Sequence, residues 1–191
     1  LYIEPVAYGF FNSLPLIRVG MFVAPGYPSI DGGKEHVEFL RKIYLSCKPW
    51  IAETLSDLDH GLETAKQMQE RYRAIQPRVT DREFAENVAN SLEITRLLIL
   101  TNNLYVKTFF AYFGYRENPI ESNRVKLSGL SVQLKSTLDQ FKNTPGFHYQ
   151  LFGIEQLLKN VGEMLADREK AETRLAKAPS RQEIEIAVAE Q

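Results

Sequence analysis

The sequence predicts an all-α fold, an antiparallel bundle of five to six helices with a mostly non-helical N-terminal arm. From Lys34 onward, apolar residues recur every three or four positions, which is the period of a helix that buries one side. Residues 1–33 instead hold four prolines and five glycines, too many for a long helix. With 191 residues, of which 44% are hydrophobic, the chain can bury a substantial core. We therefore expect residues 34–191 to form one helical-bundle domain.

The N-terminal arm, residues 1–33, differs in kind from the rest of the chain. Its apolar run LPLIRVGMFVA, residues 14–24, is predicted to be a short strand or an extended segment laid over the helices. A strand here has no clear partner in the sequence, and the chain opens on Leu1 rather than Met. We expect the chain to be a fragment, with the arm either part of this domain or the tail of a preceding one.

Prolines set the expected bounds of the first two helices. The first begins near Lys34 and stops before Pro49. The second begins near Pro49, because proline is tolerated at the first helical position, and ends at Gln76 and Pro77.

The third predicted helix is the longest and the most aromatic. Thr80 and Glu83 form a capping box at its start, and it is expected to run to Tyr115, where Gly114 breaks it. Its second half, LYVKTFFAYFGY, carries six aromatic rings within eleven residues. Rings on several faces of one helix require neighbouring helices on at least two sides.

Three further helices are expected. Asn118 is the predicted cap of the fourth, with Pro119 in its first turn. The fifth spans residues 149–178, and its later part, DREKAETRLAKA, is expected to be charged and exposed. A second capping box opens a short last helix, residues 183–190.

Composition argues against several function classes. The 23 basic and 24 acidic residues are mixed along the chain, and the net charge of −1 offers no broad positive field for nucleic acid. Apolar runs are shorter than the roughly 20 residues that span a bilayer. The single cysteine, Cys47, cannot form an internal disulfide. We expect no nucleic-acid partner, no membrane span within this chain and no cofactor.

No catalytic motif is visible in the sequence. It lacks a Gly-x-Ser-x-Gly elbow, a phosphate-binding loop and a dinucleotide fingerprint. The densest ionisable cluster places Asp59 and Glu63 on one helix face beside His60, where a metal or an acid/base pair could be built. The spacing lacks the paired Glu-x-x-His of di-iron bundles and the His-Glu-x-x-His of zinc hydrolases, and we interpret this cluster as a solvated helix face. No catalytic or metal-binding residue is assigned.

The aromatic helix supplies the candidate ligand- or partner-binding residues, Asn102, Tyr105, Phe109 and Tyr112. Packing of the rings on two sides of the helix is the first interpretation. The second is a groove or interface, because tyrosine offers apolar area with a polar tip and is common where proteins meet partners. A buried amide at Asn102 would need a hydrogen-bond partner from the backbone, water or a polar ligand.

Two segments carry a resemblance to a known family. The stretch from Leu104 to Pro119, followed by residues 144–156, is similar to the helical C-terminal modules of some large glycoside hydrolases. The resemblance covers roughly residues 34–178 and implies an accessory module whose catalytic carboxylates lie upstream, in a parent enzyme. No functional residue is carried over from that family.

These observations favour a non-catalytic helical module of a larger protein. It would act through packing or interaction with its own upstream domain or another protein, and the glycoside hydrolase accessory module is one form of this role. The alternative is a ligand-sensing bundle of a receptor, with a small polar ligand between helices near Asn102, Tyr105 and Phe109.

Overall fold

The computed structural model describes residues 34–144, 152–177 and 179, and it confirms the all-α prediction. These ranges hold six α-helices and two short 3₁₀ helices and contain no strand. In chain order the elements are α3 (Lys34–Cys47), η1 (Lys48–Trp50), α4 (Ile51–Ile75), η2 (Gln76–Arg78), α5 (Arg82–Glu117), α6 (Glu121–Lys142), α7 (Phe152–Ala166) and α8 (Arg168–Ala176). The N-terminal arm and the expected last helix, residues 183–190, lie outside the described residues.

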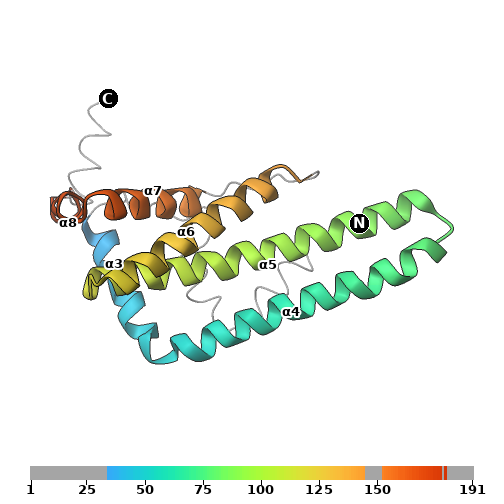
Figure 1. Ribbon diagram of the computed structural model, residues 1–191, viewed down its shortest axis with the longest axis horizontal. Coiled ribbons are helices and arrows are strands. Elements are labelled where there is room, and N and C mark those ends of the chain that lie inside the picture. Colours follow the sequence, from blue (N-terminus) through green and yellow to red (C-terminus); the bar gives the residue numbers. More distant parts are fainter. Residues whose placement is uncertain (1–33, 145–151, 178, 180–191) are drawn as a thin grey trace.

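The long helix α5 runs through the middle of the bundle (Figure 1). It packs most extensively against α4 on one side and α6 on another, and α7 packs against both α5 and α6. The short helices α3 and α8 contact each other at the end of the bundle where α5 finishes. At the opposite end, α4 and α5 form a hairpin that extends beyond α6 and α7. We call residues 66–93 the distal hairpin.

The start and end of α5 differ from the sequence prediction. Asp81, not Thr80, is the N-cap: its carboxylate accepts a hydrogen bond from the Phe84 amide at 3.0 Å. An ionised carboxylate suits the positive end of the helix dipole. The helix also passes through Gly114 and ends at Glu117, giving 36 residues. A glycine inside a helix costs only about 1 kcal/mol, which the packing of the following turn can offset.

The next two predicted helices also need correction. Asn118 does not cap α6, because its backbone N–H bonds to the Gly114 carbonyl and completes the end of α5. The N-cap of α6 is Ile120, which makes no side-chain capping bond. The expected fifth helix is two helices, since Asp167 has an extended backbone and its carboxylate caps α8 through the Lys170 amide at 3.0 Å.

The core lies where α5, α6 and α7 meet. Leu127, Leu134 and Phe141 present one apolar stripe of α6, each with no exposed surface. From α7, Leu157 and Val161 are each 1% exposed. The aromatic second half of α5 faces these side chains as part of the same hydrophobic cluster. This arrangement confirms that the ring-rich helix has neighbours on more than one side.

Candidate functional site

Three of the four candidate binding residues are buried. Tyr105 is 5% exposed and Phe109 and Tyr112 are 2% exposed, whereas Asn102 is partly buried. The rings of Phe109 and Tyr112 both contact Phe113, with ring centroids 5.0 and 5.4 Å apart. Among the described ring pairs and hydrogen bonds, none joins Asn102 or Tyr105 to these two residues. The structure therefore unites half of the candidate set in one aromatic cluster.

Arg116 links this aromatic cluster to the C-terminal helix α8. Its guanidinium lies 5.8 Å from the Tyr112 ring centre and 5.6 Å from that of Phe113. The same group donates two hydrogen bonds to the Glu172 carboxylate, at 2.8 and 2.7 Å. Burial raises the pKa of Tyr112 to about 12, so its phenol is neutral at ordinary pH. A planar guanidinium that stacks on aromatic rings and makes a bidentate pair with a carboxylate is held in one orientation.

Tyr44 extends the aromatic cluster to α3. Its ring stacks on Phe113 with centroids 5.2 Å apart and planes tilted by 20°. The phenol donates to the Glu117 carboxylate at 2.9 Å, and Lys48 donates to the same oxygen at 2.7 Å. Burial, followed by the neighbouring Glu117, raises the pKa of Tyr44 to about 12. The bond from Lys48 is the main cause that lowers the pKa of Glu117.

Asp59 of the ionisable cluster on α4 joins that helix to α5. Asp59 accepts hydrogen bonds from Asn103 at 2.9 Å and Lys107 at 2.5 Å, both on α5. The bond from Lys107, then that from Asn103, lowers the pKa of Asp59. His60 and Glu63 are exposed, as expected for a solvated face. No group of three or more metal-ligating side chains occurs among the described residues.

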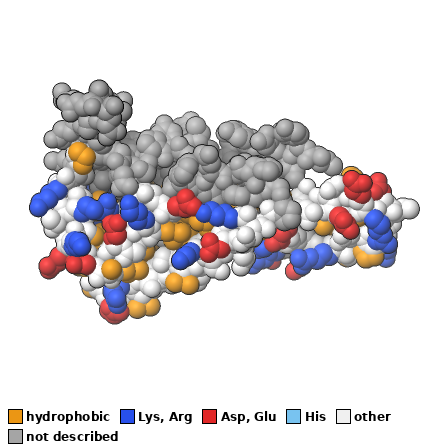
Figure 2. Space-filling model, turned by 90° about the horizontal axis from the view of Figure 1, so that it is seen from above, with side chains coloured by type: hydrophobic (Ala, Val, Ile, Leu, Met, Phe, Trp, Pro, Cys, Tyr) orange, Lys and Arg blue, Asp and Glu red, His pale blue; other side chains and the backbone are white. Residues whose placement is uncertain are grey.

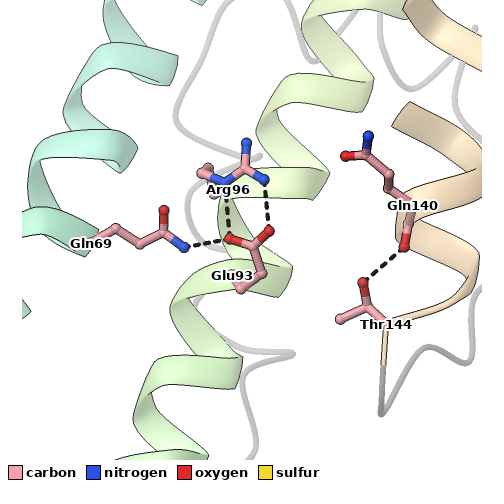
Figure 3. Close-up of polar contacts among 5 residues, drawn as sticks. All are labelled: Gln69, Glu93, Arg96, Gln140 and Thr144. Atoms are coloured by element: carbon pink, nitrogen blue, oxygen red, sulfur yellow. Dashed lines mark hydrogen bonds and ion pairs between the residues drawn. The ribbon is translucent and has the colours of Figure 1, made fainter. Parts of the chain in front are cut away.

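A second polar link between α4 and α5 lies in the distal hairpin. Glu93 accepts two hydrogen bonds from Arg96, at 2.9 and 2.7 Å, and a further one from Gln69 on α4 (Figure 3). The bond from Arg96 is the main cause that lowers the pKa of Glu93. Gln69 is only 8% exposed, so its amide needs this acceptor. The bond from Gln69 joins α4 to α5 at Glu93, and Arg96 holds the Glu93 carboxylate within α5.

One buried hydroxyl near the candidate residues has no hydrogen-bond partner. Thr101 is 2% exposed, and its Oγ1 makes no hydrogen bond among the residues that the structure describes. It lies one helical turn before Tyr105, whose buried phenol has a raised pKa because of desolvation. Thr101 was not among the candidate residues, but it adjoins Asn102 in the same helix turn. A buried hydroxyl normally has a hydrogen-bond partner, so a water molecule or a polar group is the expected partner of Thr101.

One hollow of the described part of the chain lies along α6. It is open to solvent, and its described lining residues lie on one face of that helix. The lining residues are Val132, Lys135, Ser136, Asp139, Gln140 and Asn143. At its end Thr144 donates to the Gln140 carbonyl at 3.0 Å (Figure 3).

The distal hairpin exposes apolar side chains. Met68 and Ile75 of α4 are 53% and 52% exposed, and Phe84 of α5 is 47% exposed. Charged side chains of both signs surround small hydrophobic areas at this end of the molecule (Figure 2). The inner faces of the two helices are already joined, for example by the bond from the Tyr72 phenol to the Ala85 carbonyl at 2.9 Å. The exposed side chains are therefore not needed to close the hairpin.

Sequence reasoning missed the residues that carry the interhelical contacts. Glu172 was placed in a charged, exposed segment, yet it binds Arg116, and Ala171 and Leu175 beside it are buried. The spacing of Ala171 and Leu175, four residues apart, is the signal that could have revealed this face.

Comparison with known proteins adds no relative. No protein-family model, curated protein or solved structure matches the chain. None of the described helices is both long and apolar enough to span a bilayer.

Proposed function

We propose that this chain is a non-catalytic helical module of a larger protein, and that it acts by binding its own upstream domain or another protein. The observation that carries the proposal is the distal hairpin, with Met68, Ile75 and Phe84 each about half exposed. Two long helices that project beyond the rest of the bundle make these apolar groups accessible to a partner (Figure 1). Exposed apolar side chains rimmed by charge are typical of protein interaction sites.

The aromatic cluster has a different role in this proposal. Tyr105, Phe109 and Tyr112 belong to the hydrophobic core, so they support the module and hold α5 in place. Two carboxylates, Asp59 of the ionisable cluster and Glu93 of the distal hairpin, bridge α4 and α5. Binding is thus assigned to the outer surface of the hairpin.

A site-specific crosslink tests the proposal. A photo-crosslinking phenylalanine analogue replaces Phe84 in the full-length gene product, and the same analogue at Asn90, an exposed position of the same helix, is the control. We expect one discrete crosslinked product from position 84, to an upstream domain or to another protein. Purified partner should then bind a Met68→Gln, Ile75→Gln variant at least about tenfold more weakly. Equal crosslinking at the two positions, or unchanged affinity, would contradict the proposal.

The finer assignment, an accessory module of a carbohydrate-active enzyme, rests on the resemblance of residues 104–119 and 144–156 to such modules. It requires a catalytic barrel in the same gene product. In that case the crosslink from position 84 should reach the barrel. A full-length sequence without a catalytic domain would rule this assignment out.

The unpartnered hydroxyl of Thr101 favours one second candidate, a ligand-sensing bundle. A small polar ligand held near Thr101, Asn102 and Tyr105 would raise the melting temperature of the protein. A thermal-shift screen with amino acids, organic acids and sugars measures this. A hit should disappear in Thr101→Val, which loses the hydroxyl but keeps the volume. If no compound raises the melting temperature by about 3 °C, the sensing role is wrong.

A further inference from the structure

The last described helix, α8, has few apolar attachments to the other described residues. It has nine residues, and Ala171 and Leu175 are its buried side chains. An isolated helix of this length is not stable in water, so its order depends on contacts with the rest of the bundle. Those contacts include α7, to which α8 is joined, and α3.

Charged groups supply further attachment to the described helices. Glu172 receives the two bonds from Arg116, and the side chains of this pair are 31% and 17% exposed. On the other flank Arg174 donates to Glu163 at 2.9 Å and to Asn160 at 2.6 Å, both on α7. The pair between Glu172 and Arg116 ties α8 to the central helix.

The junction between α7 and α8 permits movement of α8 alone. Asp167 has φ of −154° and ψ of 94°, an extended backbone that separates the two helices. Because the break already exists, α8 can move away without unwinding α7 once the bonds from Arg174 to Glu163 and Asn160 are also released.

We propose that α8 is a strap that opens about Asp167 when the pair between Arg116 and Glu172 breaks, and that it controls whether Tyr112 and Arg116 meet solvent. In the closed state Tyr112 is 2% exposed, and Arg116 covers its ring and is itself held by Glu172. Opening removes Glu172 and frees Arg116 to leave the ring. This device is independent of the interaction role proposed for the distal hairpin, because α8 lies at the other end of the bundle.

Amide hydrogen exchange of the full chain tests the strap. Glu172→Gln keeps the size of the side chain and removes its charge. Glu121→Gln is the matched control, because it removes the acidic member of a more exposed pair with Arg124 inside one helix. We expect residues 168–176 to exchange about five- to tenfold faster in Glu172→Gln, with α5 and α6 unchanged, because exchange reports the opening equilibrium. Raising NaCl from 0.05 to 0.5 M should speed the same amides in the wild-type protein by about twofold, since the pair is only partly screened.

Hydroxyl-radical labelling supplies an independent readout of what the strap covers. Labelling of Tyr112 should rise in Glu172→Gln, whereas labelling of Tyr105, a buried residue of the same helix, should not. The proposal is overturned if amides of α8 exchange only together with those of α7, if Glu172→Gln leaves their exchange unchanged, or if Tyr105 and Tyr112 gain label equally.

Discussion

Phe109 offers the sharpest test of the core assignment. Its ring is 2% exposed and contacts Phe110 in an edge-on arrangement at 5.5 Å and Phe113 at 5.0 Å. A buried phenylalanine removes on the order of 150 Å² from water, which corresponds to about 4 kcal/mol at roughly 25 cal/mol per Å². Phenylalanine-to-alanine changes in cores cost about 3–5 kcal/mol, in agreement with this figure. We expect Phe109→Ala to lower the free energy of unfolding by about 4 kcal/mol.

Urea unfolding followed by circular dichroism measures this loss. With a denaturant dependence of about 2–3 kcal/mol per molar, the unfolding midpoint should fall by about 1.5 M. Phe84→Ala on the same helix is the control, because that ring is 47% exposed and its removal leaves no closed cavity. Its loss should be no more than half as large.

Two outcomes would refute the reasoning about Phe109. Equal losses for the two variants would mean that burial does not set the contribution of these rings. A folded Phe109→Ala protein that loses less than about 1 kcal/mol would show that the ring is not a core element. If such a variant had also lost partner binding, the ring would belong to an interface.

The remaining predictions concern a cap and two titrating groups. Asp81→Ala should cost about 1 kcal/mol and Thr80→Ala much less, as measured by thermal unfolding, because the observed cap is Asp81. Asp59→Ala should cost about 1–2 kcal/mol at pH 7, since the Asn103 amide, 1% exposed, loses its acceptor. Because the pKa of Asp59 is lowered in the folded state, its contribution is present above about pH 4 and is lost as pH falls further, so this variant should show a shallower acid limb in unfolding experiments. The pKa of Tyr44 is raised to about 12 in the folded state, so its contribution to the free energy of unfolding is complete below about pH 10 and is lost as pH rises toward 12. Tyr44→Phe should therefore lose less stability than the wild-type protein between about pH 10 and about pH 12. A variant whose stability falls as steeply as that of the wild type would contradict this.

The number, order and approximate length of the long helices could be predicted from the sequence because they depend on local signals. Apolar spacing and the proline at position 49 placed α3 and α4 to within a few residues. The long aromatic helix was likewise predicted with an error of about two residues at each end. Such signals act within a few positions of the chain, so one sequence contains them.

The errors arose where two local signals competed. Thr80 and Asp81 are both good N-cap residues, and it is the carboxylate of Asp81 that accepts the capping hydrogen bond. Gly114 is a strong stop signal, but Tyr115 beyond it is 7% exposed, and its burial favours continued helix. Asp167 was read as part of a charged helical run, although it is also a good N-cap.

The polar contacts between helices could not be predicted. Asp59 meets Lys107 across 48 positions of sequence, and Arg116 meets Glu172 across 56. These pairings depend on how far each helix is rotated and shifted against its neighbour, which local patterns such as apolar spacing and caps do not reveal. The role of the four candidate binding residues in recognition stays a prediction, although the burial of three of them favours a structural role.

The length of α5 has a mechanical consequence. With 36 residues it is about 54 Å long, and α3, α6, α7 and α8 gather around its C-terminal half. The N-terminal half of α5 therefore projects from the aromatic cluster, and a tilt of the helix at that cluster moves its far end most. Phe109 lies about 40 Å along the helix from Arg82, so a tilt of about 5° at that cluster displaces the far end by about 3–4 Å. In the proposed interaction role, a small repacking of these rings would move the partner-binding surface at the tip by that distance.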